Sequence, residues 1–302
     1  MNDNCRYDVV GLGTVLIDHV VRLAEYPEVD SKNAAVGDHY QVGGPVPTAL
    51  AALRRFGRSC CFIGRWGHDP YGRMIDDDFV AEGIDAAGSH RCDQTRTGFA
   101  HVWVCGRTAR RTIAYQRATE IITPEAIDPD LIAASRVLHL DGWPADTALA
   151  AARIAHRAGR TVTLDAGSPK PGMTDLLAHV DVVNAPARFI RQFLDHDDID
   201  TGIKRLLTMG PRLVTITSGH EGAAIGDAHG IVHLPAPAID PVDTTGAGDV
   251  FSGALIHGLL EDWPPQRMLQ FAITAAALKC RKLGNREAIP DRREIESHVC
   301  PA

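Results

Sequence analysis

The sequence lacks both a long apolar run and the layout of a secretory signal. No uninterrupted apolar stretch reaches the roughly 20 residues that a membrane-spanning helix needs. The chain opens on M-N-D-N-C-R-Y-D, whereas a signal peptide begins with a basic segment and continues with an apolar one. These absences predict a cytoplasmic protein with no membrane partner.

Disulfide and zinc-binding patterns are missing as well. The seven cysteines are odd in number, and no two of them form a C-x-x-C pair. Disulfide frameworks and structural zinc sites are usually built from paired cysteines at short, regular spacings. We therefore expect reduced thiols, which fits a cytoplasmic location.

The chain also has no excess of basic residues. It carries 31 Lys and Arg against 38 Asp and Glu, which gives a net charge of −7. Nucleic-acid-binding proteins concentrate positive charge on one face or in one run, and no such run occurs here. We expect no nucleic-acid partner.

Two common nucleotide-binding fingerprints are absent. The first strand-like segment, Y-D-V-V-G-L at 7–12, continues as G-T-V-L and so does not form G-x-G-x-x-G. No G-K-[ST] follows any glycine-rich turn. These gaps argue against an NAD-dependent oxidoreductase and against a P-loop enzyme.

What the chain does contain, beyond about residue 120, is an alternation of strand-like and helix-like segments. Such alternation predicts right-handed βαβ units and a parallel sheet, with ligands at the carboxyl ends of the strands. A length of 302 residues suits one large α/β domain with an appendage, or two domains. The predicted strands are 137–140, 162–164, 180–183 and 213–217, and the predicted helices lie near 146–158, 172–178, 185–194 and 198–208.

The most informative stretch is D-P-V-D-T-T-G-A-G-D-V-F-S-G-A-L-I-H-G-L-L at 240–260. A glycine-rich turn runs into an apolar helix, and the first N–H groups of a helix have no partner within it. Together with the helix dipole they form an anion site. Asp249 at this helix start is either a helix cap or a general base beside the anion site.

Three segments of the chain have a family resemblance. D-T-T-G-A-G-D-V-F-S-G-A at 243–254 closely resembles the C-terminal signature of the ribokinase-like (PfkB) carbohydrate kinases. A strand at 34–42, paired glycines and an Ala-rich helix are similar to that family's N-terminal signature, and G-H-D-P-Y-G at 67–72 is similar to its G-x-D-x-x-G turn. The resemblance spans Tyr7 to Pro290.

This resemblance implies a three-layer α/β/α fold with a mostly parallel central sheet and a small β-sheet lid. We expect a single kinase domain over 1–302, with lid segments at about 31–42 and 98–116. The second lid segment also reads as a hairpin from its own pattern, because G-F-A-H-V-W-V and R-T-I-A-Y flank a polar turn. A lid with an exposed apolar face implies a homodimer.

The implied reaction is transfer of the γ-phosphoryl group of ATP, brought as its Mg²⁺ complex, to a primary hydroxyl of a small sugar. Asp249 would accept the hydroxyl proton. The N–H groups of Gly246, Ala247 and Gly248 would stabilise the charge on the transferring group.

The same resemblance assigns residues to the sugar. Asp18, expected at a strand end, would hold hydroxyl groups, and Gly43 and Gly44 would let the backbone approach the sugar. Thr48 stands where the family usually has Asn. Asp141 is either a sugar contact or a loop cap, and Lys32 is either a contact to an acidic substituent or a solvated loop lysine.

A further set of residues is assigned to ATP and cations. Asn184 belongs to an N-x-x-E pair whose glutamate position is Ala187, which puts a direct metal contact in doubt. The Ala-rich helix at 268–279 could pack near adenine. Thr217, Gly219, Gly222 and Gly248 would contact ATP, and Asp243, Thr245 and Gly284 mark a possible K⁺ site.

The substrate stays open. Lys32, Thr48 and the tail A-L-K-C-R-K-L-G-N-R-E-A-I-P-D resemble the ketose and sulfofructose kinase branch, although the arginine expected for a sulfonate is not evident beside Trp143. A nucleoside kinase of the same family and a catalytically idle sugar-binding regulator are the alternatives. The intact Asp249 argues against the idle relative.

Overall fold

The structure, a computed structural model, describes residues 5–108 and 110–299. Its largest element is an eight-stranded sheet in the order β14-β13-β12-β11-β10-β9-β1-β4. The strands from β4 to β12 pair in parallel, and β13 and β14 add an antiparallel edge. The mostly parallel sheet is therefore confirmed. The strands are β1 (Tyr7–Leu12), β4 (Cys60–Ile63), β9 (Ser135–Leu140), β10 (Thr161–Asp165), β11 (Val182–Pro186), β12 (Leu213–Thr217), β13 (Ala223–Asp227) and β14 (Gly230–Leu234).

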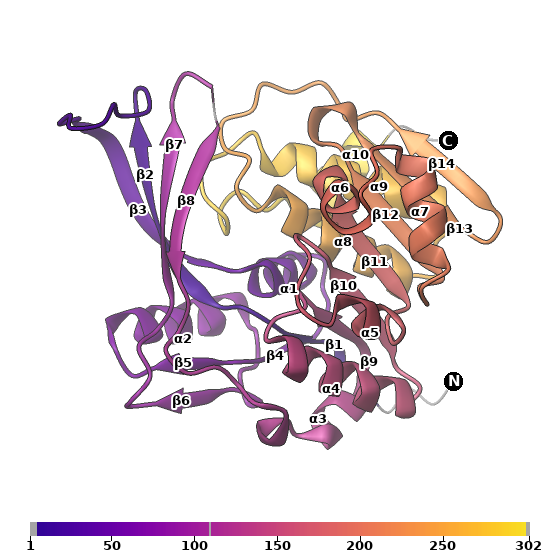
Figure 1. Cartoon of the computed structure of the whole chain (residues 1–302). Coiled ribbons are helices and arrows are strands. Elements are labelled where there is room, and N and C mark those ends of the chain that lie inside the picture. The colour runs from indigo at the N-terminus through magenta and orange to yellow at the C-terminus, as the bar shows by residue number, and fades with distance from the viewer. Residues whose placement is uncertain (1–4, 109, 300–302) are drawn as a thin grey trace.

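Helices cover both faces of this sheet (Figure 1). Val9 of β1 packs into one apolar core and its neighbour Val10 into the other, because successive strand side chains point to opposite faces. Strands buried on both faces read as continuous apolar runs, as β1 does. One core takes residues from α1 (Pro45–Arg55), α2 (Pro70–Glu82), α8 (Ala247–Leu260), α9 (Pro265–Lys279) and α10 (Arg292–His298), and the other from α3 (Pro129–Ala133), α4 (Ala145–Arg157), α5 (Met173–Leu177), α6 (Ala187–Leu194) and α7 (Ile199–Leu207).

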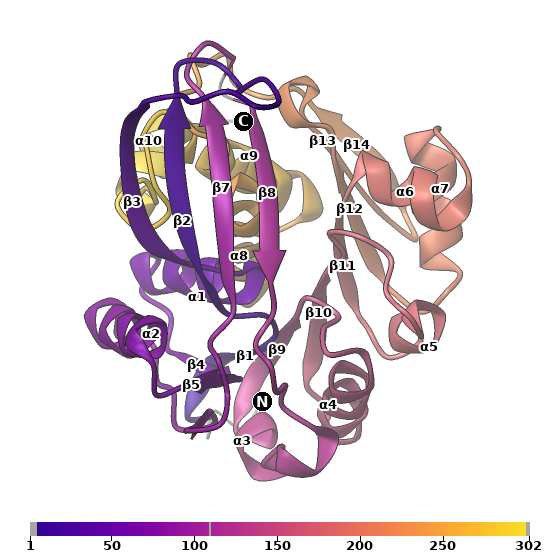
Figure 2. The same cartoon turned by 60° about the vertical axis from the view of Figure 1, so that its left-hand side comes forward.

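A second, four-stranded sheet has the order β3-β2-β7-β8 and stands apart from the first. Figure 2 shows it in front of α8, α9 and α10, with no helix drawn over its near face. We call it the small sheet. Its strands are β2 (Leu16–Leu23), β3 (Ala35–Gly43), β7 (Phe99–Cys105) and β8 (Arg111–Gln116).

The small sheet differs from the sequence expectation in one respect. Its two predicted segments supply β3, β7 and β8, but β2 was not expected there. β2 pairs in parallel with β7, so Asp18 lies inside a strand opposite Ala100 and not at a strand end. This pairing joins segments about 80 residues apart, which no local pattern specifies.

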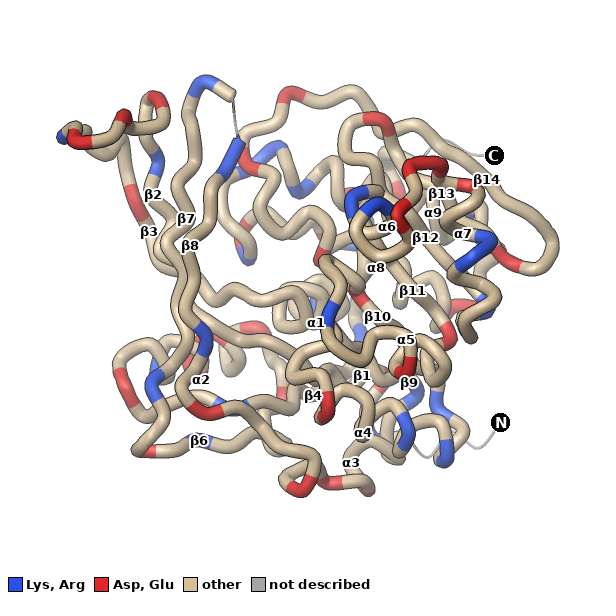
Figure 3. Tube along the Cα trace, in the orientation of Figure 1, with Lys and Arg blue, Asp and Glu red and all other residues tan. Residues whose placement is uncertain are grey.

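The remaining elements are short. A two-stranded sheet joins β5 (Arg65–Gly67) to β6 (His90–Cys92), and 3₁₀ turns occur at η1 (Pro124–Ala126) and η2 (Gly219–Glu221). None of the described helices combines the length and apolarity that crossing a bilayer requires. Figure 3 shows Lys and Arg interspersed with Asp and Glu along the trace, and no long basic run.

Candidate active site

The turn before α8 is built from hydrogen bonds to one buried carboxylate. Asp243 Oδ1 accepts from the N–H of Thr245 at 2.8 Å, and Oδ2 accepts from the N–H of Gly284 at 3.1 Å. Gly246 then caps the helix with φ 77°, a left-handed conformation that favours glycine. The carboxylate of Asp243 therefore shapes the turn that starts α8.

The start of α8 exposes donors in one direction. The N–H of Ala247 donates to Thr244 O at 3.3 Å, and that of Val250 to Gly246 O at 2.9 Å. Among the described residues, the N–H groups of Gly246, Gly248 and Asp249 have no acceptor. These groups and the helix dipole would attract an anion. Of the three predicted anion-hole donors, Ala247 alone already has a partner.

Four carboxylates from four elements influence one another around this helix start. Burial is the main cause of the raised pKa values of Asp18 in β2 and of Asp165 at the end of β10, and the charge of Asp249 in α8 raises both further. Asp141, which follows β9, raises those of Asp165 and Asp249. The fold thus brings the predicted residues Asp18, Asp141 and Asp249 together, and adds Asp165.

Asp249 is the most accessible of these four side chains. It is partly exposed, whereas the other three are buried. Burial raises the pKa of its carboxyl, while the nearby charges of Arg111, Lys279 and Arg286 lower it. No hydrogen bond to its carboxylate occurs within the described ranges, so both oxygens are free to accept a proton or a hydrogen bond from a ligand.

Asp18 sits in a space that only glycine leaves open. A Cβ on Gly43, in the neighbouring strand β3, would lie 2.4 Å from Asp18 Oδ2. Gly44 has φ 108°, and a Cβ there would lie 2.2 Å from Thr14 O. Burial, reinforced by the charge of Asp249, raises the pKa of Asp18 to about 7, although the charges of Arg111 and Arg286 oppose the shift. Gly43 therefore makes room for the Asp18 carboxylate.

Asp141 has a visible structural role. Its Oδ2 accepts from the N–H of Thr14 at 2.8 Å and its Oδ1 from the N–H of Trp143 at 2.9 Å. The carboxylate thus fixes the backbone at Thr14 and at Trp143, as the loop-cap interpretation expects. Each oxygen keeps a further acceptor position, so a sugar contact stays compatible with this geometry.

The amide of Asn184, a predicted ATP contact, is engaged in hydrogen bonds within the protein. Its Nδ2 donates to Ser252 Oγ at 2.9 Å, and its Oδ1 accepts from Thr215 Oγ1 at 2.9 Å. Ser252 in turn donates to Asp165 Oδ2 at 3.0 Å. Burial, followed by the charge of Asp249, raises the pKa of Asp165 to about 8. This network ties β10, β11 and β12 to α8 beneath the helix start.

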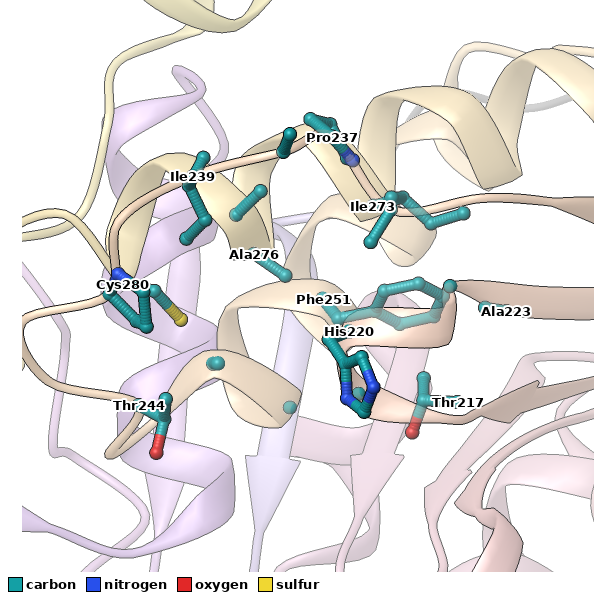
Figure 4. A pocket seen from close by; sticks show the side chains of 18 residues that line it. Thr217, His220, Ala223, Pro237, Ile239, Thr244, Phe251, Ile273, Ala276 and Cys280 are labelled. Atoms are coloured by element: carbon teal, nitrogen blue, oxygen red, sulfur yellow. The ribbon is translucent and has the colours of Figure 1, made fainter. Parts of the chain in front are cut away.

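A cavity of about 480 Å³ opens beside the same helix start (Figure 4). The predicted residues Thr217, Gly219, Gly222 and Gly248 all line it. Its remaining walls are largely apolar and small, which suits a flat heteroaromatic base. They include Phe251 of α8, Ile273, Ala276 and Ala277 of α9, and Pro237 and Ile239 of the segment between β14 and α8.

Positive side chains to which the sequence analysis assigned no role lie around the acidic cluster. The Arg117 guanidinium lies 4.1 Å from the ring centroid of Trp143. Arg111 of β8 donates to Thr244 Oγ1 at 3.3 Å. Arg286 bridges to Asp78 and donates to Thr48 Oγ1 at 3.3 Å. The absence of an arginine near Trp143 is thus true of the local sequence but wrong for the folded chain.

Two predicted sugar contacts differ in where they lie. Thr48 is fully buried in α1, and its Cγ2 would lie 3.4 Å from a Cβ on Gly246, so it adjoins the helix start. Lys32 is exposed and belongs to the connection between β2 and β3, a segment that Figure 1 shows at the outer end of the small sheet. This exposure is compatible with a solvated loop lysine, and a contact to an acidic substituent stays a prediction.

The sequence matches a protein-family model described as pfkB family carbohydrate kinase over residues 7–292. The ATP-dependent ribose-1-phosphate kinase of Halopiger xanaduensis is 29% identical over 283 residues, covering 93% of this chain and 94% of the relative. The ribokinase of Haemophilus influenzae is 25% identical over 294 residues, covering 94% and 95%.

Solved structures share the fold. Arabidopsis thaliana ribokinase complexed with ribose and ATP superposes with a TM-score of 0.85 at 22% identity, covering 98% of this chain and 99% of that one. A putative ribokinase II from E. coli in complex with ATP and Mg²⁺ gives 0.85 at 21% identity, covering 96% and 98%. The three-layer arrangement with a small separate sheet is therefore that of known proteins.

Proposed function

The chain belongs to the PfkB family of carbohydrate kinases, and we propose that it transfers the γ-phosphoryl group of ATP to a primary hydroxyl of a small sugar. The observation that carries the proposal is the position of Asp249. Its partly exposed carboxylate lies at the helix start whose free N–H groups border the apolar cavity. A base, an anion site and a nucleotide cleft are thus adjacent.

The proposed step is an in-line displacement at the γ-phosphorus. The acceptor oxygen forms a bond to phosphorus while the bond from phosphorus to the β,γ-bridging oxygen breaks, so ADP leaves. The hydroxyl proton passes to Asp249. The N–H groups of Gly246 and Gly248 stabilise the phosphoryl oxygens, and Ala247 joins them if its bond to Thr244 O opens.

Binding of ATP is proposed for the cavity beside α8. The small side chains of α9 leave a flat apolar slot for adenine, and Thr217, Gly219 and Gly222 border it at the end of β12. The two structural relatives that are described as complexes with ATP support ATP as the nucleotide. Asn184 would act through Ser252 and not by direct contact.

Mg²⁺ would be held chiefly by the triphosphate. Of the described residues, no group of three or more His, Cys, Asp or Glu could form a metal cage, and Ala187 offers no ligand. Mg²⁺ commonly binds through phosphates, waters and one or two carboxylates. Bound in this way, it would neutralise charge on the β- and γ-phosphates.

The test is a coupled ADP-release screen with Mg²⁺ present. The acceptors are pentoses, hexoses, ketoses, sugar phosphates, sulfofructose and nucleosides. One strong acceptor whose turnover is lost in Asp249→Asn supports the proposal and names the substrate. If only nucleosides give strong ADP release, the protein is a nucleoside kinase and the sugar-kinase proposal is wrong. If no acceptor gives ADP release although ATP binds, a catalytically idle sugar-binding regulator is favoured.

A finer proposal concerns the acceptor, which we infer carries a negatively charged substituent. The side chain of Lys170 lies next to Gly142. Burial and the charge of Arg117 lower the pKa of Lys170, whereas the carboxylate of Asp141 raises it. Lys170 Nζ donates to the carbonyl and the Oγ of Ser168 at 3.1 and 2.6 Å, but neither Lys170 nor Arg117 forms an ion pair with any described residue. Two unpaired cations beside the acidic cluster would complement a phosphate, carboxylate or sulfonate. A relative named for ribose 1-phosphate fits this class.

Arg117→Met is expected to remove this preference. We expect kcat/KM for a phosphorylated sugar to fall by about 10- to 100-fold, because a charged hydrogen bond contributes about 1.5–3 kcal/mol. The value for the matching neutral sugar should change by less than about threefold. Arg110→Met, an exposed arginine on the same hairpin, is the control. Equal losses on charged and neutral acceptors would contradict the proposal.

We also propose that the small sheet acts as a lid and pairs with a second copy. His19 stacks on Tyr40 at 4.3 Å and lies edge-on to His101, and Trp103 follows on the same face of β7 while 43% exposed. An apolar and aromatic face of this kind favours association. Light scattering should report twice the chain mass, and Trp103→Asp should halve it. A wild-type mass equal to one chain would exclude the dimer.

A further inference from the structure

A lysine is completely buried beneath the turn that starts α8. Lys279 ends α9, and its side chain has 0% exposure. Its Nζ donates to the backbone carbonyl of Asp243 at 2.9 Å and lies 3.8 Å from Asp243 Oδ2. The ammonium group therefore occupies the inner side of the turn that the resemblance assigns to a monovalent cation.

The residues around Asp243 cannot bind K⁺ in addition to the Lys279 ammonium group. A dehydrated K⁺ needs several oxygen ligands to replace its hydration shell. The Asp243 carbonyl already accepts from Lys279, and its carboxylate accepts from the N–H groups of Thr245 and Gly284. A second cation would also repel the ammonium in a buried, weakly screened environment.

We infer that the ammonium group of Lys279 is a built-in substitute for the monovalent cation, so that this kinase works without K⁺. The inference rests on the proposed function for its catalytic consequence but on geometry for the site itself. Lys279 neutralises the buried Asp243, and its charge also favours the ionised form of Asp249. It is a positioning residue, since it acts through the turn and not on the substrate.

The contacts explain how one lysine could hold the anion site open. Asp243 and Val242 also donate their N–H groups to Cys280 O, so the turn is fastened to the end of α9 at several points. A buried carboxylate that loses its cation is strongly destabilising. The turn would then rearrange and carry the N–H groups of Gly246 and Gly248 with it.

The first test uses the wild-type protein in buffers whose only monovalent cation is tetramethylammonium, with and without KCl. Turnover is expected to change by less than about twofold, and the melting temperature should not respond to KCl beyond the response to tetramethylammonium chloride. Activation by K⁺ of about tenfold or more, or a K⁺-specific stabilisation, would overturn the inference.

The second test removes the Lys279 ammonium group by mutation and supplies a monovalent cation in the buffer instead. Lys279→Ala should lower the melting temperature and reduce turnover by about 10- to 100-fold, and K⁺ or NH₄⁺ should restore both, because the vacated carbonyl and carboxylate can then bind a free cation. Lys282→Ala, an exposed lysine three residues along, is the control and should show neither effect. Loss without rescue would assign Lys279 a purely structural role.

The melting measurements separate this inference from the proposed function. They report cation binding whether or not a sugar acceptor has been found. If no acceptor is phosphorylated, the effect of K⁺ on the melting temperatures of the wild type and Lys279→Ala still shows whether Lys279 replaces the cation. If Lys279→Ala does not fold, Lys279→Met keeps the side-chain volume, and the wild-type response alone remains a complete test.

Discussion

Asp249→Asn is expected to lower kcat by about 10²- to 10⁴-fold, the range that a positioned general base supplies. Asn keeps the shape of the side chain but cannot take the hydroxyl proton. The KM for ATP should stay within about twofold, because Asp249 does not line the cavity proposed to bind ATP. Steady-state kinetics with a fixed acceptor and varied ATP measure both quantities.

The structure makes this expectation specific to Asp249. Its carboxylate has no hydrogen-bond or ion-pair partner among the described residues, so Asn breaks no such bond, although it removes the attraction to the charges of Arg111, Lys279 and Arg286. The melting temperature of the variant should therefore not fall below that of the wild type, because burial disfavours the charged form of this carboxyl. Asp240→Asn, at an exposed position in the preceding loop, is the matched control and should retain full activity. A retained kcat in Asp249→Asn would remove the residue from the mechanism.

Asp18→Asn is expected to lower kcat/KM for the acceptor by about 10²- to 10³-fold. A carboxylate can accept hydrogen bonds from two neighbouring hydroxyl groups, and losing the charged acceptor costs about 3–4 kcal/mol over two such bonds. Asn offers one acceptor oxygen and introduces an amide donor where hydroxyl donors should bind. The KM for ATP should be affected by less than about threefold.

The pH dependence provides a second reading of Asp18. Burial raises its pKa to about 7, so the carboxylate is protonated below that pH and ionised above it. Acceptor kcat/KM in the wild type should therefore fall as the pH decreases through 7. The ionisation near 7 should disappear in Asp18→Asn, while the raised ionisation of Asp249 remains.

A matched control for Asp18 lies on the neighbouring strand. Asp38 of β3 is exposed and pairs with His19 at 2.9 Å, away from the acidic cluster. Asp38→Asn should leave kcat/KM and its pH profile unchanged. If Asp18→Asn keeps the wild-type profile, then Asp18 does not bind the acceptor in its ionised form.

Two of the proposed roles depend on close approach of backbone to side chain. Gly43 leaves the space that Asp18 fills, and Gly246 adopts a conformation that starts α8. Both glycines stand in short contiguous motifs. That is why motif reading could point to them, although it assigned Gly43 to the sugar and the structure relates it first to Asp18.

The contiguous parts of the site were accessible to sequence reading. The alternation beyond residue 120 predicted the parallel strands β9 to β12, because apolar strands and amphipathic helices each carry a local period. The turn at 243–249 could likewise be predicted from the sequence, because a glycine pair, a carboxylate and an apolar helix follow one another directly. Thr217, Gly219 and Gly222 formed one motif and line one cavity.

Only the tertiary structure decided which distant residues meet. Arg117 reaches Trp143, Lys279 reaches Asp243, and β2 pairs with β7, each across a separation that leaves no periodic or motif signal. Asn184 stayed where the motif placed it, but packing turned its amide toward Ser252. The sequence by itself determined the sheet, the helix start and the family, because those depend on neighbouring residues. Packing decided which positive side chains lie around the acidic cluster and which ammonium group lies beside Asp243, because the order of residues does not mark these partners.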